Sequence, residues 1–208
     1  MALTNTQEEA IFASVLADGK IHVASAEGVE GAVKREYETS DGAKGSKWEK
    51  VYTQLSGIIS EFKFVEGNYG QQIFVTVKDG DSKPVTLTLS TNSNFGEDFM
   101  KKIFNVDMSK PVSLSPYSFE DDKGKNRKGI TIIQDGNKIK NYFYDETNKK
   151  NINGYPNPTE GRNKQPKNAD QWKMYFMEAR LFLIDKVIEH FKLDKPKEKE
   201  IDPDSIPF

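Results

Sequence analysis

Residues 71–105 read QQIFVTVKDGDSKPVTLTLSTNSNFGEDFMKKIFN, and the change of period inside this stretch decides the fold. Apolar and polar residues alternate over 71–78 and again over 85–91, which predicts two strands. The Asp-Gly-Asp-Ser sequence at 79–82 predicts a turn between them. After residue 93 the spacing becomes helical, which predicts a helix over 94–105 that carries Phe95, Phe99, Ile103 and Phe104.

The sequence on both sides extends this pattern. Residues 47–65 predict one long strand with a bend near Gly57, because glycine inside a strand often marks a bulge or bend. Residues 111–120 and 128–134 predict two strands after the helix. The order strand, strand, strand, helix, strand, strand over 47–134 predicts an OB-fold, a five-stranded barrel with a helix between strands three and four. An immunoglobulin-like sandwich needs about seven strands and no inserted helix, so it matches less well.

Further elements flank this predicted barrel. Thr6 and Glu9 have the spacing of a capping box, which predicts a short helix through Leu16. Residues 20–25 and 33–39 predict two strands. Asp135-Gly136 predicts a hairpin turn into a last strand over 138–144. A long apolar periodicity predicts a C-terminal helix over 170–193.

The chain is therefore predicted to be mainly β, an OB-fold five-stranded barrel with added N-terminal elements and a C-terminal α-helix. Docking on the barrel explains the broad apolar surface of that helix, and a homodimer contact through one of its faces is the alternative. The predicted parts are an N-terminal helix-and-strand extension (1–46), the OB core with an extra strand (47–144) and a basic loop (145–168). They are followed by the helix (169–195) and a disordered acidic tail (196–208).

The composition excludes several classes of protein. The absence of cysteine removes disulfides and thiolate chemistry, and it fits a reducing cytoplasm. Glu8 and Glu9 stand where a secretion signal would be basic and then apolar, and no run of about 18 apolar residues predicts a membrane span. The two histidines, His22 and His190, lie far apart and have no metal-ligand neighbours at a suitable spacing.

Enzyme motifs are also missing from the sequence. There is no Walker A motif and no nucleophile elbow. A metal-dependent nuclease is a weak alternative, because the acidic residues that could hold a metal lie in predicted turns, where acids are common: Asp79, Asp81, Asp121 and Asp122. The expectation is a binding protein that is not an enzyme and uses no metal or cofactor.

Charge is unevenly distributed along the chain. Residues 1–100 hold 9 Lys and Arg against 15 Asp and Glu, a net charge of -6. Residues 101–173 hold 15 against 9, a net charge of +6, and residues 174–208 hold 6 against 8. Because local charge decides whether phosphates bind, the net charge of -2 leaves room for a nucleic-acid binder.

Proteins that bind single-stranded nucleic acids combine cations for phosphates with aromatic rings for bases. Strand parity and charge identify such residues on three predicted strands and one loop: Gln72 and Phe74; Trp48, Lys50 and Tyr52; Lys138, Lys140, Tyr142 and Tyr144; and Lys123, Lys125, Arg127 and Lys128. The alternative is that the rings pack against the N-terminal elements as a second core and that the charges only cover solvated surface.

The chain ends in Ile-Asp-Pro-Asp-Ser-Ile-Pro-Phe, residues 201–208. This end resembles the acidic tail of single-stranded DNA-binding proteins (SSBs), which closes on acidic residues followed by Ile/Leu-Pro-Phe. The body is similar in plan to bacteriophage SSBs, which add elements to an OB barrel. The sequence departs from this family in two ways: the long linker of such proteins is reduced here to 195–199, and the acids of the tail are few.

The resemblance implies a protein that coats single-stranded DNA in replication, recombination and repair, in the bacterial cytoplasm or a phage-infected cell. It also implies that the tail recruits replication and recombination proteins through Asp202, Asp204, Ile206, Pro207 and Phe208. The competing class is an OB-type module that binds a protein, a carbohydrate or another ligand and has no role on DNA.

Overall fold

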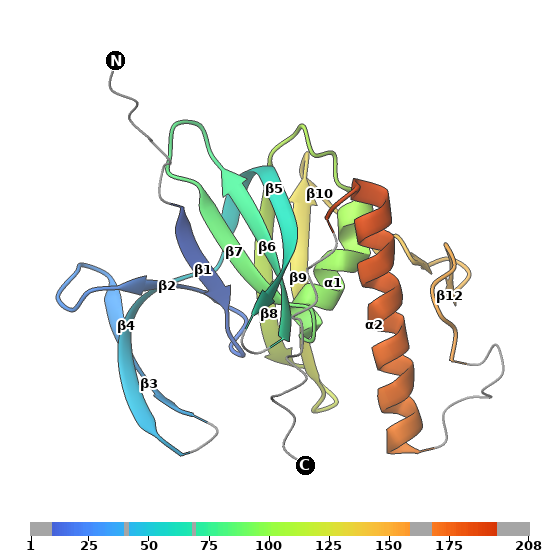
Figure 1. Ribbon diagram of the computed structural model, residues 1–208, viewed down its shortest axis with the longest axis horizontal. Coiled ribbons are helices and arrows are strands. Elements are labelled where there is room, and N and C mark those ends of the chain that lie inside the picture. The colour runs from blue at the N-terminus through green and yellow to red at the C-terminus, as the bar shows by residue number, and fades with distance from the viewer. Residues whose placement is uncertain (1–9, 40–41, 68–69, 159–167, 195–208) are drawn as a thin grey trace, which may run out of the picture.

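A computed structural model describes residues 10–39, 42–67, 70–158 and 168–194. Their main feature is a ten-stranded sheet with the order β10-β9-β8-β5-β6-β7-β1-β2-β4-β3 (Figure 1). Its strands are β1 (Ile11–Val15), β2 (Ile21–Ser25), β3 (Ala32–Glu38), β4 (Lys44–Tyr52), β5 (Leu55–Gly67), β6 (Gly70–Lys78), β7 (Val85–Ser90), β8 (Val112–Glu120), β9 (Asn126–Gln134) and β10 (Asn137–Lys138). The remaining elements are α1 (Asn94–Lys102), the 3₁₀ turn η1 (Ile103–Asn105), the small pair β11 (Tyr144–Asp145) and β12 (Lys150–Asn151), and α2 (Ala169–Phe191).

The chain is mainly β, as predicted, and the central order of three strands, a helix and two strands is confirmed. The alternating pattern of β6 and β7 places Ile73, Val75, Leu87 and Leu89 on one buried face. Helix α1 starts where the Ser93 hydroxyl accepts a 3.1 Å hydrogen bond from the Gly96 N–H, which caps the first turn.

The predicted helix through residues 11–16 is wrong, because Ile11–Val15 forms strand β1. This strand pairs in parallel with β7, with Ala13 opposite Leu87, and antiparallel with β2. The spacing of the apolar residues suits a helix, but β7 offers a free edge of backbone groups. Ala13 fits the core there with almost no exposure. Long-range pairing therefore overrides a weak local preference.

The predicted long strand over 47–65 is also wrong, because Thr53 and Gln54 divide it into β4 and β5. Strand β5 continues to β6 and β8, whereas β4 pairs with β2 and β3. In Figure 1, β3 and β4 curve away from the body of the sheet as a two-stranded arm. We use "the arm" for β3 and β4, residues 32–52.

The described part of the sheet stays open, so the predicted closed barrel is not confirmed. The edge of β7 is occupied by β1. The outer edge of β9 is occupied by side chains of α1. The Asp98 carboxylate accepts a 2.8 Å bond from the Ile130 N–H, and the Lys102 ammonium donates a 2.7 Å bond to the Ile130 carbonyl. These bonds satisfy the backbone groups with which a closing strand would pair.

The turn between β1 and β2 packs directly on β8. Gly19 is buried in this turn with φ +73°, and a Cβ at this position would collide with the backbone of Tyr117 and Ser118. Only glycine combines this conformation with so close an approach. The contact brings the end of β1 and the start of β2 against β8, although no strand pairing joins them.

Helix α2 confirms the predicted C-terminal helix and lies beside the sheet with α1 (Figure 1). Its buried residues include Leu183 and Val187. Near its end, the Phe191 ring meets the Phe62 ring of β5 edge-on at 4.8 Å between centroids. The helix thus docks on the core, as the first of the two interpretations predicted.

The predicted strand over 138–144 is wrong. Asn137 and Lys138 pair with β9, the Ile139 N–H donates one further bond to the Ile132 carbonyl, and the chain then leaves the sheet. The Tyr142 ring stacks on Phe104 of η1 at 4.9 Å, and Phe143 is buried between elements. Burial of two aromatic side chains here outweighs the continuation of a two-residue edge pairing. The predicted basic loop after residue 144 begins with the β11–β12 pair.

Candidate nucleic-acid interface

The predicted row of Trp48, Lys50 and Tyr52 forms on β4. These residues lie opposite Ser25, Val23 and Ile21 of β2, so the row shares the face of the sheet that is buried further along. On the arm this face is more exposed to solvent: Tyr52 is 46% exposed, and Trp48 and Lys50 are half-buried. Lys34 of β3 lies opposite Trp48 and adds a cation to the row.

The other face of the arm carries a buried carboxylate. Glu49 is only 2% exposed, and its oxygens lie 2.7 Å from Arg35 Nε, 2.7 Å from Lys47 Nζ and 2.9 Å from His22 Nδ1. The hydrogen bond from Arg35, opposed by burial and helped by Lys47 and His22, lowers the pKa of Glu49 to about 2. The cluster joins β2, β3 and β4 and holds the register in which the opposite row is presented. Its Arg35 and Lys47 are already paired, so they are poorer partners for phosphates.

The hairpin between β8 and β9 carries the predicted basic loop. The Asp121 carboxylate accepts bonds from the backbone N–H groups of Lys123 (3.0 Å) and Lys125 (2.9 Å), and from Arg127 Nε (2.8 Å). These backbone bonds, led by that from Lys125, and the Arg127 bond lower the pKa of Asp121. The loop is therefore a defined turn in which the side chains of Lys123 and Lys125 point into solvent. Lys128 is half-buried nearer to α1.

Two aromatic residues of β8 were missed by the prediction. Phe119 is 55% exposed and lies directly opposite Arg127, and its ring is 5.8 Å from the Tyr117 ring. Burial raises the pKa of Tyr117, with a smaller effect from Asp98. The sequence did carry a signal for these two rings, because residues 113, 115, 117 and 119 alternate with the buried residues 112, 114 and 116. Pro116 obscured this alternation, since proline is uncommon inside a strand.

Two contacts connect the chain around the β4 row to β8. Tyr52 is opposite Ile21, which follows the turn that packs on Tyr117 and Ser118. Two residues after Tyr52, the Gln54 amide lies 3.4 Å from the Ser113 hydroxyl of β8. The β4 row shares the buried face of the sheet, whereas Phe119 alternates with the buried residues of β8 and lies on the other face. Arg127 is already paired with Asp121, so it is a poorer partner for phosphates, as Arg35 and Lys47 are. We call the two sets together the ring-and-cation surface: Trp48, Lys50 and Tyr52 on β4, and Phe119, Lys123 and Lys125 on the β8–β9 hairpin.

Phe74 and Gln72 lie elsewhere. The register from β6 through β7, β1 and β2 to β4 puts Phe74 on the face opposite the β4 row. Phe74 is half-buried, and Phe12 of β1 contacts it edge-on at 5.8 Å. Phe12 is 59% exposed and was missed because its segment was predicted to be a helix. Had Ile11–Val15 been predicted as a strand, the alternation of its side chains would have identified Phe12 as an exposed ring.

The predicted row of Lys138, Lys140, Tyr142 and Tyr144 does not form. Lys138 ends β10, and the Lys140 ammonium lies 3.1 Å from the Glu146 carboxylate in the following loop. Tyr142 packs on Phe104, whereas Tyr144 belongs to β11. The tail residues Asp202, Asp204, Ile206, Pro207 and Phe208 lie outside the described residues.

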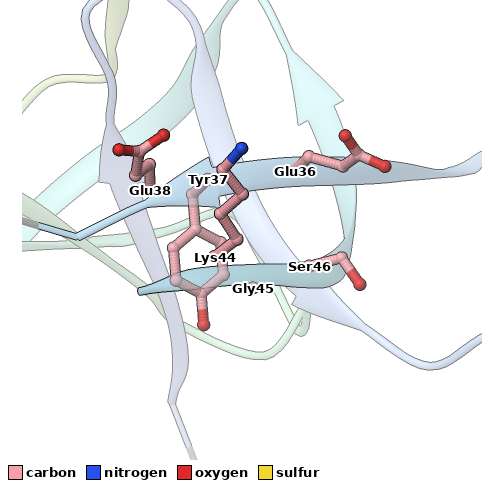
Figure 2. Close-up of a pocket in the computed structure, with 6 residues that line it drawn as sticks. All are labelled: Glu36, Tyr37, Glu38, Lys44, Gly45 and Ser46. Carbon is pink, nitrogen blue, oxygen red and sulfur yellow. The ribbon is translucent and has the colours of Figure 1, made fainter. Parts of the chain in front are cut away.

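A hollow at the tip of the arm is a poorer match to phosphates. Figure 2 shows Tyr37 lying across Gly45, with Glu36, Glu38, Lys44 and Ser46 around it. The Arg35 guanidinium is 5.7 Å from the Tyr37 ring centre. Two carboxylates accompany one lysine in this hollow, so its charge favours the approach of a cation over that of an anion.

Other classes of site find little support. Among the described residues, no three His, Asp or Glu side chains gather as a metal site would require. In the same parts of the chain, neither helix has the apolar length needed to cross a bilayer. No family model, curated protein or solved structure matches the chain.

Proposed function

We propose that this protein binds single-stranded DNA without sequence preference and coats exposed strands during replication, recombination and repair. The observation that carries the proposal is the ring-and-cation surface, where exposed Tyr52 lies on β4 with Lys50 and Trp48, and exposed Phe119 shares the β8–β9 hairpin with the exposed Lys123 and Lys125. Aromatic faces stack on any base at about 1–3 kcal/mol per base, and nearby cations bind the phosphates between them.

The arrangement of strands supports an OB-type assignment as part of this proposal. The order β9-β8-β5-β6-β7, with α1 between β7 and β8 in the chain, is the order of strands in an open OB barrel. In this proposal β1 and the edge contacts of α1 replace the closing strand pair. The β8–β9 hairpin then corresponds to the loop between strands four and five, which often contacts ligands in this fold.

Binding of this kind reads the nucleic acid by stacking and charge. The proposed surface has few side chains of the sort that read base edges, so the affinity for different sequences should be similar. Each phosphate contact on a single strand contributes about 0.7 to the slope of log K against log salt. The tail is proposed to recruit replication and recombination proteins through its terminal Ile-Pro-Phe.

The test is the binding of a fluorescent oligo-dT to the full chain at two salt concentrations. The proposal predicts tight binding at low salt, weaker binding at high salt and little competition from duplex DNA of equal length. An oligo-dT that stays unbound at low salt would overturn the proposal. It would then favour the alternative of a protein-binding module, to which the exposed Met174, Met177 and Leu181 of α2 already point.

A further inference from the structure

Strand β3 is the last strand of the ten-stranded sheet, and in the described residues it pairs only with β4. Its other edge carries unpaired backbone groups, which are a template for another strand. Val33 and Tyr37 on this strand are 50% and 40% exposed. Within the described parts of the chain, neither the backbone edge nor these two side chains are therefore covered by another strand.

The backbone groups that face this edge can be identified. Two backbone bonds mark which residue pairs of the ladders are hydrogen-bonded. The Leu16 N–H donates to the Lys20 carbonyl at the β1–β2 turn, and the Thr39 N–H donates to the Ala43 carbonyl at the β3–β4 turn. Antiparallel pairs alternate, so residues 33, 35 and 37 exchange their bonds with β4. The N–H and C=O groups of Lys34 and Glu36 consequently point away from the sheet.

The side chains of this edge are complementary to themselves. Two antiparallel copies of β3 that cross at Arg35 would place Lys34 of each opposite Glu36 of the other, and Val33 opposite Tyr37. Lys34 and Glu36 would form the hydrogen-bonded pairs, as the outward backbone groups require. Arg35 would face its own copy, but its charge is already matched by Glu49 at 2.7 and 3.1 Å.

We propose that two copies of the chain join through β3 as a twofold dimer, centred on Arg35, with a sheet continuous across both. Opposite charges and an aromatic–β-branched pair are the favourable partners in such a contact. Shifting the centre to Lys34 or Glu36 would place like charges opposite each other, so this register is selected. The twofold axis keeps the β4 rows of both copies on the same face of the continuous sheet. If the proposed function holds, both rows would then face the same DNA strand.

Charge reversal tests the interface without DNA. Lys34→Glu and Glu36→Lys each turn two attractive pairs into repulsive ones, and each should weaken the dimer at least about tenfold in sedimentation velocity. The double variant Lys34→Glu/Glu36→Lys restores the pairing and should restore the dimer. Glu38→Lys is the matched control, because residue 38 faces Ala32 in this register.

Cross-linking tests the register itself, because the chain has no cysteine of its own. An oxidised mixture of the Val33→Cys and Tyr37→Cys variants should give a disulfide-linked heterodimer, since non-hydrogen-bonded partners lie about 4.5 Å apart. Either variant alone should give none, because residue 33 faces only residue 37 of the other copy. Circular dichroism checks that both variants fold.

Three results would overturn the dimer. The first is a chain that stays monomeric at tens of micromolar, and the second is cross-linking by a single variant alone. The third is a dimer that Leu181→Glu on α2 dissociates while both β3 reversals leave it intact. None of these measurements involves DNA, so failure of the dimer and failure of the proposed function can be told apart.

Discussion

At the residue scale, Glu49 shows how a buried charge can organise a surface that it does not touch. The carboxylate is shielded from water and accepts bonds from side chains of three strands. Removal of its charge would leave Arg35 and His22 with one partner fewer in a partly buried site. The same cluster fixes Trp48, Lys50 and Tyr52 on the opposite face, because neighbouring residues of a strand point to opposite sides.

Glu49→Gln should lower the free energy of unfolding by about 3 kcal/mol near pH 7, as the depressed pKa implies. A carboxyl with a lowered pKa stabilises the fold fully above its unfolded pKa of 4.5 and loses this effect as the pH falls toward about 2. Urea unfolding at pH 7 and pH 3 should therefore show a smaller difference for the variant than for the parent chain. Glu61→Gln, at an exposed side chain of β5, is the control and should change little.

Trp48→Ala and Tyr52→Ala should each weaken oligo-dT binding by about 5- to 160-fold, the loss of one stacked base at about 1–3 kcal/mol. Fluorescence anisotropy at constant salt measures this. Phe176→Ala removes an aromatic ring of similar exposure on α2 and should leave the affinity unchanged. Equal losses from all three variants would point to a general effect on folding and away from stacking on β4.

At the scale of elements, the turn between β1 and β2 holds the added strands against β8. Gly19→Ala should therefore destabilise the protein by more than about 2 kcal/mol, since both its positive φ and the backbone of Ser118 oppose a Cβ. Gly28→Ala is a matched control with a similar φ of +78° and open space around it, so it reports the cost of the backbone conformation alone. Thermal or urea unfolding compares the two, and equal losses would show that the contact with β8 contributes nothing.

The β8–β9 hairpin makes its own prediction. Replacing Lys123 and Lys125 together by alanine should lower the salt slope of oligo-dT binding by roughly 1.4, that is 0.7 for each lost phosphate contact. Lys83→Ala/Lys173→Ala removes two exposed lysines from other elements and should not change the slope. A slope that falls equally in both double variants would assign the effect to overall charge.

At the scale of the whole molecule, the proposal separates DNA binding from partner recruitment. Deletion of Ile206, Pro207 and Phe208 should leave oligo-dT affinity unchanged or raise it, because these residues have uncharged side chains and no part of the ring-and-cation surface is lost. Binding of replication and recombination proteins to the DNA-bound chain should disappear, which a pull-down on immobilised oligo-dT would measure. Undiminished capture by the deleted chain would contradict the proposed role of the tail.

Local periodicity by itself determined much of this protein. The alternation in β6 and β7, the helical spacing of α1 and α2, and the parity of Trp48, Lys50 and Tyr52 all depend on neighbours along the chain. The same is true of the charged turn at Lys123 and Lys125. Such features are visible in the sequence because each residue contributes to the pattern independently of distant partners.

Only the tertiary structure decided which strands meet. The edge of β7 turned Ile11–Val15 from an expected helix into a strand, and the break at Thr53 and Gln54 sent β4 out into the arm. The packing of Tyr142 and Phe143 against Phe104 ended the strand expected after residue 138. These outcomes depend on backbone edges and apolar surfaces brought together from distant parts of the chain, and their free energy has no local signature in the sequence.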